Sequence, residues 1–299
     1  MKTGYVLVTP ARNEGRYLTE TIESVLAQTV LPRRWVIVSD GSTDDTESIA
    51  SRYSLQHSII TLIRRSGDAT RNYGSKVRAI WAGIEELCNT EYDFIGILDA
   101  DVSFERNYYE NVLKEFDRNP RLGIAGGITR ERDGHGFSLQ FGTTERCVPG
   151  PIQLFRRQCY EEIGGLRALR YGGEDTAAIE MARMQGWEVL AFRDLVVWHH
   201  RRVGTEGMGI LPARFRHGLE DYCVGYHPLF EVGKCVRRLA ERPYVLGSVF
   251  RMSGYLWAAM TRQKRELPAE FVRYLRSQQM RRLLGEGEAE DGAKSAGAL

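Results

Sequence analysis

The chain has 299 residues, of which 42% are hydrophobic and 27% are charged. This balance is too apolar for a disordered protein and too charged for a protein that crosses a membrane many times. The length allows one large domain, or one domain with an appendage. The five cysteines are scattered without a CxxC pair, which argues against a disulfide framework or a zinc ribbon and favours a reducing compartment.

Charge is distributed unevenly along the chain. The formal net charge is only +2, yet residues 201–282 hold 16 Lys and Arg against 7 Asp and Glu. Residues 1–200 hold 24 Lys and Arg against 28 Asp and Glu. A basic segment therefore follows a slightly acidic one.

Short apolar runs alternate with helical patterns in the first 130 residues. The pattern predicts strands at residues 5–8, 35–38, 59–63 and 94–98, helices at residues 17–28, 42–53, 71–88 and 107–116, and an apolar run at 122–128. Apolar strands separated by helices are typical of an α/β fold with a mostly parallel, Rossmann-like sheet flanked by helices. Because such sheets bind ligands where their strands end, the residues after each strand are the candidate site residues.

The second half of the chain has a different character. Residues 134–151 are irregular, and the pattern then predicts helices at about 156–163 and 175–185 and a strand at 189–198. Beyond residue 205 the pattern is helical, with prolines between the helices. We therefore expect three parts, which are an α/β domain at residues 1–205, a basic helical C-terminal extension at 206–284 and a disordered tail at 285–299.

Two carboxylates follow the strand at residues 94–98. Asp99 and Asp101 are one residue apart at the end of an apolar run, which puts oxygen ligands at the ligand-binding edge of the sheet. Mg²⁺ and Mn²⁺ prefer such ligands, and phosphate oxygens often complete their coordination. Aspartates that cap a helix would give the same short pattern.

Other acids and histidines occupy comparable positions. Asp40 ends a strand and precedes a glycine, where a carboxylate can accept a hydrogen bond from a base or a ribose hydroxyl. Glu174 and Asp175 follow a glycine pair at the start of a helix, which suits either helix capping or a general base. His199 and His200 end a later strand and are either structural or metal-ligating.

Taken together and in this order, these motifs resemble the inverting family-two glycosyltransferases of the GT-A fold. The resemblance covers roughly residues 3–205. It rests on residues 8–14, 38–46, 67–74, 98–101 and 173–175, with further similarity at 150–157 and 163–165. It implies that residues 1–205 form a nucleotide-sugar-binding and catalytic domain.

The resemblance implies a role for each motif residue. The residues that would hold the nucleoside are Pro10, Ala11, Glu14, Asp40 and Arg71. Asp99 would lie near the ribose and metal-bound water, and Asp101 would ligate a divalent cation, Mn²⁺ or Mg²⁺. His199 would be a further metal ligand, although His200 is equally capable. Asp175, beside Glu174, would be the catalytic base.

The implied reaction is a single displacement at the anomeric carbon of a nucleoside-diphosphate sugar, which inverts the configuration of that carbon. The base would act on the acceptor hydroxyl, and the metal would neutralise the departing diphosphate. We expect a metal-dependent hexosyltransferase that favours a UDP-sugar as donor. The expected acceptor is a saccharide or a lipid-linked molecule, in the synthesis of cell-surface polysaccharide or glycolipid.

Two other functions fit parts of this pattern. A nucleotidyltransferase would also bind nucleotide and metal, but residues 10–14 lack the glycine-rich, lysine-bearing loop that such an enzyme carries after its first strand. A catalytically inactive nucleotide-sugar-binding or scaffold protein of the same fold is the other alternative. The presence of Asp99, Asp101, Glu174 and Asp175 together argues against it. The basic segment carries no nucleic-acid-binding motif, so nucleic acid is not an expected partner.

The basic segment contains an apolar stretch at residues 244–260. This stretch is shorter than the roughly 20 apolar residues of a spanning helix, and Arg251 interrupts it. Aromatic residues and flanking cations suit a helix at a membrane interface, and they are Phe250, Tyr255, Trp257, Arg237, Arg238, Arg242, Arg262, Lys264 and Arg265. A helical appendage packed on the catalytic domain is the alternative. We expect a cytoplasmic protein without a signal peptide, peripheral on the inner face of an anionic membrane.

Overall fold

The computed structural model describes residues 4–67, 73–133, 136–139, 144–201 and 209–285. The chain divides into two compact units. The first unit comprises Met1–Ala168 and Glu174–Val203, and the second comprises Leu169–Gly173 and Gly204–Leu299. Of the tail predicted at residues 285–299, all but the first residue lies outside the described residues.

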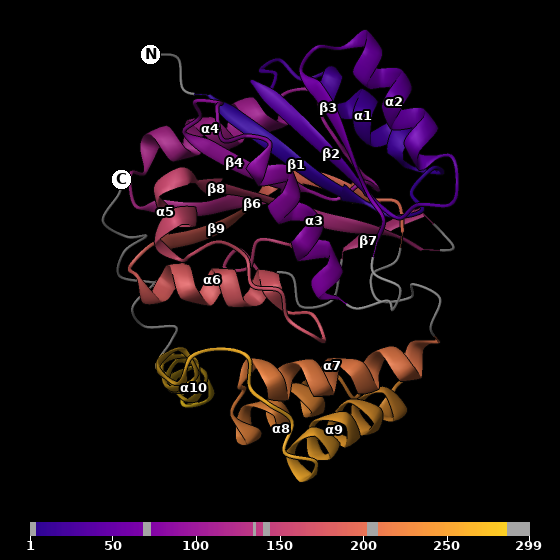
Figure 1. The fold of residues 1–299 in the computed structure, drawn as a ribbon. Coiled ribbons are helices and arrows are strands. Elements are labelled where there is room, and N and C mark those ends of the chain that lie inside the picture. The colour runs from indigo at the N-terminus through magenta and orange to yellow at the C-terminus, as the bar shows by residue number, and fades with distance from the viewer. Residues whose placement is uncertain (1–3, 68–72, 134–135, 140–143, 202–208, 286–299) are drawn as a thin grey trace. The chain divides into compact units, whose positions relative to one another are not determined.

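A sheet forms the centre of the first unit, and over the described residues it has nine strands (Figure 1). The strands run in the order β3-β2-β1-β4-β8-β6-β9-β5, and β7 pairs with β6. Their bounds are Tyr5–Ala11 (β1), Arg34–Asp40 (β2), Ile60–Arg65 (β3), Phe94–Leu98 (β4), Val102–Phe104 (β5), Leu122–Asp133 (β6), Gly136–Leu139 (β7), Ile152–Arg156 (β8) and Glu188–His199 (β9).

Six helices belong to the described part of the first unit. They are α1 (Leu18–Leu26), α2 (Thr46–Gln56), α3 (Gly74–Glu85), α4 (Tyr108–Arg118), α5 (Arg157–Glu162) and α6 (Glu174–Met184). Strands β1 to β4 are parallel to one another, and helices connect them. The predicted α/β fold is therefore confirmed.

Side chains of the parallel strands alternate between two buried faces of the sheet. Leu7 and Ile37 belong to the apolar core that also contains residues of α1 and α4. Val8 and Val38 point the other way, toward Gly83 of α3. Because successive strand residues face opposite sides of a sheet, these contacts show that helices cover both sides.

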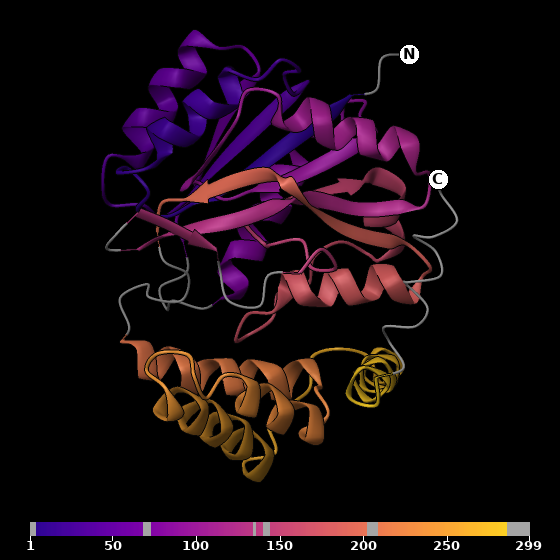
Figure 2. The same ribbon diagram turned by 180° about the vertical axis from the view of Figure 1, so that it is seen from behind.

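Beyond β4 the sheet is mixed. Strand β8 is antiparallel to both β4 and β6, whereas the long strands β6 and β9 run parallel, as the view from behind shows (Figure 2). Strand β5 pairs antiparallel with the end of β9, so that Val102 lies opposite His199. This pairing brings the residues that follow β4 next to the end of β9.

One helix begins later than the pattern predicts. Helix α2 starts at Thr46 rather than at residue 42, because the Asp44 carboxylate accepts hydrogen bonds from the backbone N–H groups of Thr46 (3.0 Å) and Gly15 (2.9 Å). Ser42 accepts a further hydrogen bond from the backbone N–H of Asn13 (3.2 Å). Residues 42–45 thus remain a loop that joins the regions after β1 and β2.

The described part of the second unit is helical. Its helices are α7 (Ile210–Val224), α8 (Pro228–Arg237), α9 (Val245–Met260) and α10 (Ala269–Leu283). In the described part of the chain, none of the helices combines the length and the apolar character that crossing a membrane requires. The structure corrects one expectation for α9, because Tyr255 is only 5% exposed and its hydroxyl donates to the carbonyl of Tyr226. Tyr255 is therefore a core residue and not an interfacial one.

Helices α7 and α9 approach each other very closely. A Cβ atom on Gly218 would lie 1.9 Å from the carbonyl oxygen of Arg251, and one on Gly254 would lie 2.0 Å from that of Phe215. Such distances leave no room for a side chain, so the two glycines fix the crossing. The second unit therefore depends on a backbone-to-backbone contact.

Candidate active site

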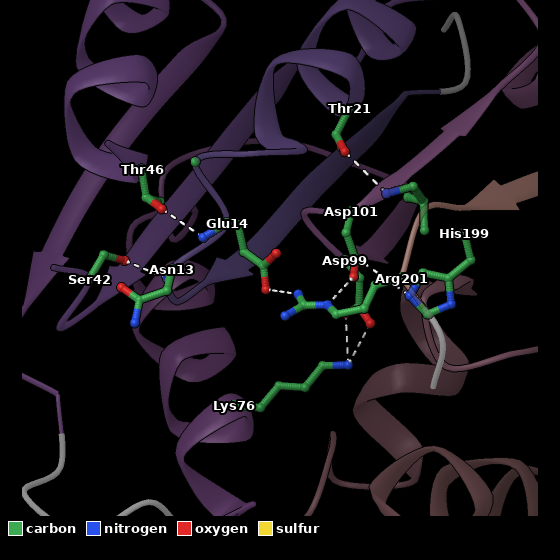
Figure 3. A network of polar contacts seen from close by, with 12 residues as sticks. Asn13, Glu14, Thr21, Ser42, Thr46, Lys76, Asp99, Asp101, His199 and Arg201 are labelled. Carbon is green, nitrogen blue, oxygen red and sulfur yellow. Dashed lines mark hydrogen bonds and ion pairs between the residues drawn. The ribbon is translucent and has the colours of Figure 1, made fainter. Parts of the chain in front are cut away.

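The ends of the parallel strands bring several acids together (Figure 3). Glu14 follows β1, Asp40 is the last residue of β2, and Asp99 and Asp101 follow β4. Ala11 is buried at the end of β1, and Pro10 is half-buried beside it. Arg71 lies outside the described residues. The carboxylates that end or follow the parallel strands therefore lie at a single edge of the sheet.

Asp101 lies at the centre of this cluster and is 4% exposed. Its carboxylate contacts Nε2 of His199 at 3.2 Å and Nε of Arg201 at 3.0 Å. Burial alone would raise the pKa of Asp101, but the hydrogen bond from His199 and the charges of His199 and Arg201 outweigh it and lower the pKa to about 2. Asp101 is thus an anion held by two basic groups.

The backbone explains why His199 reaches Asp101. Strand β5 begins directly after Asp101, and its pairing with β9 sets Val102 opposite His199. The backbone N–H of Val102 also donates to the hydroxyl of Thr21 in α1 (3.2 Å), which holds the start of β5 in place. His200 points elsewhere, and its Nε2 lies 2.8 Å from the Ser103 hydroxyl and 3.2 Å from the Glu20 carboxylate.

Asp99 has a different cationic partner. Nζ of Lys76, a residue of α3, lies 2.7 and 3.0 Å from the two carboxylate oxygens of Asp99. Burial raises the pKa of Asp99, and the charge of Lys76 opposes that rise. Burial would lower the pKa of Lys76, but Asp99, Glu174 and Asp175 together raise it above its ordinary value. These four residues therefore belong to one electrostatic neighbourhood.

Arg201 joins two strand ends. Its guanidinium contacts Glu14 through Nη2 and Asp101 through Nε, so it lies between the residues that follow β1 and β4 (Figure 3). Burial raises the pKa of Glu14 to about 7, although the hydrogen bond from Arg201 opposes the rise. The backbone N–H of Glu14 is fixed by a 2.7 Å hydrogen bond to the hydroxyl of Thr46.

Asp40 is 4% exposed and is held by residues of the protein, while its Oδ1 forms no hydrogen bond with the described residues. The hydroxyl of Ser75 donates to its carboxylate at 2.5 Å, and Nη1 of Arg65 forms an ion pair with it at 3.1 Å. Ser75 belongs to α3, and Arg65 ends β3. Asp40 therefore ties α3 and β3 to the end of β2, in addition to any contact that it makes with a ligand.

Glu174 and Asp175 are the first two residues of α6. They follow Gly172 and Gly173, whose φ angles of 99° and 91° lie in the region that glycine tolerates best. A Cβ atom on Gly150 would lie 2.8 Å from the Asp175 carboxylate, so a larger residue at position 150 would displace this side chain. Burial raises the pKa of Glu174, and Lys76 opposes the rise.

The structure adds residues that the sequence motifs did not identify. Lys76 and Arg201 contact the candidate acids directly, and Ser75 and Arg65 contact Asp40. Arg201 comes two residues after His199, the last residue of β9. Its position at a strand end could therefore have identified it as a site residue from the sequence. Lys76 and Ser75 lie inside a helix, and only the packing of α3 on the sheet brings them to the acids.

The sequence profile described as "Glycosyl transferase family 2" matches residues 6–164. This chain belongs to glycosyltransferase family 2. The match spans the parallel strands together with Glu14, Asp40, Asp99 and Asp101. Family membership confirms the resemblance predicted from the motifs and separates the chain from the nucleotidyltransferases.

Curated relatives match part of the chain. The 4,4'-diaponeurosporenoate glycosyltransferase of Staphylococcus aureus strain RF122 is 27% identical over 180 residues. That match covers 53% of this chain and 45% of the relative, and the protein of strain MRSA252 matches over the same shares. The aligned part of this chain therefore corresponds to less than half the length of these relatives.

Solved structures share the fold. A mannosyltransferase from Pyrobaculum calidifontis, solved with GDP-Man and Mn²⁺, superposes with a TM-score of 0.58 at 18% identity, over 97% of this chain and 80% of that one. Residues 1–349 of S. aureus TarS, solved with UDP-GlcNAc, superpose with a TM-score of 0.56 at 14% identity, over 91% and 78%. The predicted GT-A fold is confirmed.

Proposed function

We propose that this chain is a metal-dependent, inverting hexosyltransferase that moves a sugar from a nucleoside-diphosphate sugar to an acceptor hydroxyl. The observation that carries the proposal is the cluster of Glu14, Asp99, Asp101 and His199 at the carboxyl edge of the sheet. Asp101 and His199 are buried, and Glu14 and Asp99 are half-buried. Four groups that bind cations or sugar hydroxyls meet where α/β sheets bind ligands. The presence of Asp175 in the same neighbourhood supports an enzyme rather than an inactive scaffold of this fold.

The proteins that resemble this chain support a nucleotide sugar as donor. The P. calidifontis enzyme is titled a mannosyltransferase with GDP-Man and Mn²⁺, and TarS is titled with UDP-GlcNAc. We favour a UDP-sugar for this chain. The S. aureus relative is named a 4,4'-diaponeurosporenoate glycosyltransferase. For this chain we propose a saccharide or lipid-linked acceptor in cell-surface polysaccharide or glycolipid synthesis.

Asp101 and His199 fit a divalent cation, either Mn²⁺ or Mg²⁺. They offer a carboxylate and an imidazole nitrogen 3.2 Å apart, and Mn²⁺ accepts both donor types. The described residues contain no cluster of three or more His, Cys, Asp or Glu side chains that could hold a metal, so the donor diphosphate and water would complete the coordination. When bound, the cation would act as a Lewis acid on the departing diphosphate.

The nucleoside would lie against the ends of β1 and β2. We assign Pro10, Ala11, Glu14, Asp40 and Arg71 to that contact, with Asp99 near the ribose. Oε2 of Glu14 is buried and has no hydrogen-bond partner among the described residues, so it is a ready acceptor for a ligand hydroxyl or N–H group. Lys76 and Arg201 would remain near the diphosphate, where positive charge is favourable.

Asp175 would act as the base on the acceptor hydroxyl. A carboxylate in the first turn of a helix is stabilised as an anion by the helix dipole. Burial raises the pKa of the neighbouring Glu174, and the charge of Lys76 opposes the rise. We assign proton abstraction to Asp175, as the resemblance to the family implies, and positioning to Glu174. We also propose a cytoplasmic location, on the inner face of the membrane.

A screen of nucleotide sugars tests this proposal. The protein is incubated with UDP-, GDP- and dTDP-sugars in Mn²⁺ or Mg²⁺, and release of nucleoside diphosphate is measured. We expect release from one donor class above the rate without protein. Binding of a nucleotide sugar without release, even with an acceptor mixture present, would instead identify an inactive binding protein.

A further inference from the structure

Helix α9 has its polar and apolar sides reversed relative to an ordinary surface helix. Its only charged residue, Arg251, is 5% exposed, while its outward side chains are apolar. Ser253 is the one polar residue exposed in α9, which is described throughout. The exposed apolar residues of this helix, 36–72% accessible, are Val245, Leu246, Val249, Phe250, Leu256, Trp257 and Met260. We call these seven residues the outer face of α9.

The inner side of α9 is fixed by paired charges. Nε of Arg251 donates to Glu231 of α8 at 2.9 Å, and Nη2 of Arg251 contacts Asp221 of α7. Nζ of Lys234 lies 3.0 Å from the other oxygen of Asp221. A rotation of α9 that buried its apolar face would leave these buried charges unpaired, which is strongly unfavourable. The outer face is therefore held outward by the interior of the unit.

Glycines prevent any simple rearrangement of this helix. Gly254 lies directly against the backbone of α7, so the side of α9 that faces α7 is set by close backbone approach. Ser248 on the same inner side donates to the carbonyl of Cys235 in α8 (2.8 Å). Seven apolar side chains on one face need an apolar environment that the protein interior does not supply.

Charge around the outer face selects its partner. In the fully described stretch from residue 226 to residue 265, the exposed charged side chains are the cations Arg237, Arg242, Arg262, Lys264 and Arg265. Exposed acids follow only beyond this stretch, at Glu266 and Glu270. The acids of this stretch are engaged with arginines, Glu231 with Arg251 and Glu241 with Arg214 and Arg238. A second copy of the chain would bring two cationic rims together, whereas an anionic surface neutralises them.

We infer that the outer face of α9 docks on an anionic lipid bilayer, with the helix lying in the plane of the interface. Its 16 residues span roughly 24 Å, less than the roughly 30 Å hydrocarbon core, so the helix lies along the bilayer and does not cross it. Trp257 and Tyr244 (54% exposed) have the amphipathic rings that prefer the headgroup region. This inference rests on the proposed function, because it identifies the membrane surface at which the proposed transferase would act.

Vesicle binding tests the inference without any substrate. The full chain is sedimented with phosphatidylcholine vesicles, with or without phosphatidylglycerol, at low and high salt. We expect binding to the anionic vesicles, weakened by salt because screening shortens the range of the attraction. The variant Val249→Gln/Leu256→Gln changes two side chains that are 54% and 50% exposed, so it should fold normally and bind on the order of tenfold more weakly. Leu55→Gln, at an 86% exposed position in the first unit, is the matched control and should bind like the wild type.

Fluorescence supplies a second readout at one residue. Trp257 should shift its emission to shorter wavelength on anionic vesicles, and Trp257→Phe should remove that shift. Equal binding of the wild type and the α9 double variant would overturn the inference. A concentration-dependent dimer that the double variant abolishes, with no vesicle binding, would overturn it in favour of self-association. Because vesicle binding needs no donor, release of nucleoside diphosphate without vesicle binding would overturn the inference and leave the proposed transfer reaction intact.

Discussion

At the edge where β1, β2 and β4 end, the buried carboxylates have partners of opposite charge. Asp99 has Lys76, Asp101 has His199 and Arg201, and Asp40 has Arg65. Taking a carboxylate out of water is costly unless a partner compensates for the lost hydration. The site therefore holds a concentrated set of anions in a folded protein before any ligand arrives.

Asp175 provides the sharpest test of the proposed chemistry at a single residue. Asp175→Asn preserves the shape of the side chain but cannot accept the acceptor proton. We expect turnover to fall by ~10²–10⁴, with donor affinity nearly unchanged. Turnover follows from nucleoside diphosphate release, and donor affinity from calorimetry. If donor affinity falls as much as turnover, Asp175 holds the donor or the fold and is not the base.

The wild-type product gives an independent check on the same assignment. A base that activates the acceptor for one direct displacement predicts inversion at the anomeric carbon. The anomeric proton couplings in the NMR spectrum of the product report its configuration. Retention of the donor configuration would require a different mechanism.

We expect His217 to make the stability of the protein depend on pH. Burial lowers the pKa of His217 to about 2, with help from the charges of Arg216, Arg251 and Arg214 and against that of Asp221. Below the ordinary histidine pKa of about 6.5, the unfolded chain binds a proton that the folded chain refuses. Folding stability contributed by this group is therefore complete above pH 6.5 and declines as the pH falls.

Urea denaturation between pH 5 and pH 7 measures this effect. We expect the wild type to lose stability below pH 6.5 by as much as about 1.4 kcal/mol per pH unit from this residue. His217→Gln should flatten that dependence, whatever its effect on stability at pH 7. The same pH slope in both proteins would show that His217 is protonated when folded.

The strand ends identified the acids of the site, but not the cations that accompany them. Asp40, Asp99 and Asp101 each follow an apolar run, and that position alone predicts their common edge. Lys76 lies inside α3, and its contact with Asp99 depends on how α3 packs on the sheet. No pattern local to residue 76 carries that information.

At the level of elements, the close approach of α7 and α9 is the most demanding feature. Gly254→Ala would place a methyl group 2.0 Å from the carbonyl oxygen of Phe215, so one helix must move. We expect a loss of about 1–3 kcal/mol in the free energy of unfolding, measured by urea denaturation.

Gly233→Ala in α8 is the matched control for that variant. Its new methyl group would meet only the exposed tip of Leu283, at 3.3 Å, which can give way. Alanine also has the higher helix propensity, so this variant should be neutral or slightly stabilising. An equal loss of unfolding free energy in both variants would mean that α7 and α9 leave room for a methyl group at position 254.

The strands that the pattern predicted are continuous apolar runs, as for β1, β2 and β4. The structure adds β5, β7 and β8, which the pattern did not predict. β5 has only three residues, and its extended form depends on pairing with β9. Because short antiparallel strands are stabilised mainly by their partners, sequence periodicity does not reveal them.

On the scale of the whole molecule, the site depends on segments that are far apart in the sequence. Arg201 and Asp101 are 100 residues apart and meet because β9 returns beside β5. The predicted order of strands and helices was enough to place the acids on one fold. The meeting of Asp101 with His199 and Arg201 required the register between β5 and β9, which the sequence pattern does not specify.

Through Asp101, glycosyl transfer by this chain should depend on a divalent cation. The most direct measurement is the rate of nucleoside diphosphate release in Mn²⁺ and in EDTA, for the wild type, Asp101→Ala and Asp117→Ala. Asp117 is exposed on α4 and serves as the control. We predict that EDTA and Asp101→Ala each abolish release, while Asp117→Ala retains it. Full activity of the wild type in EDTA, or of Asp101→Ala in Mn²⁺, would contradict the account.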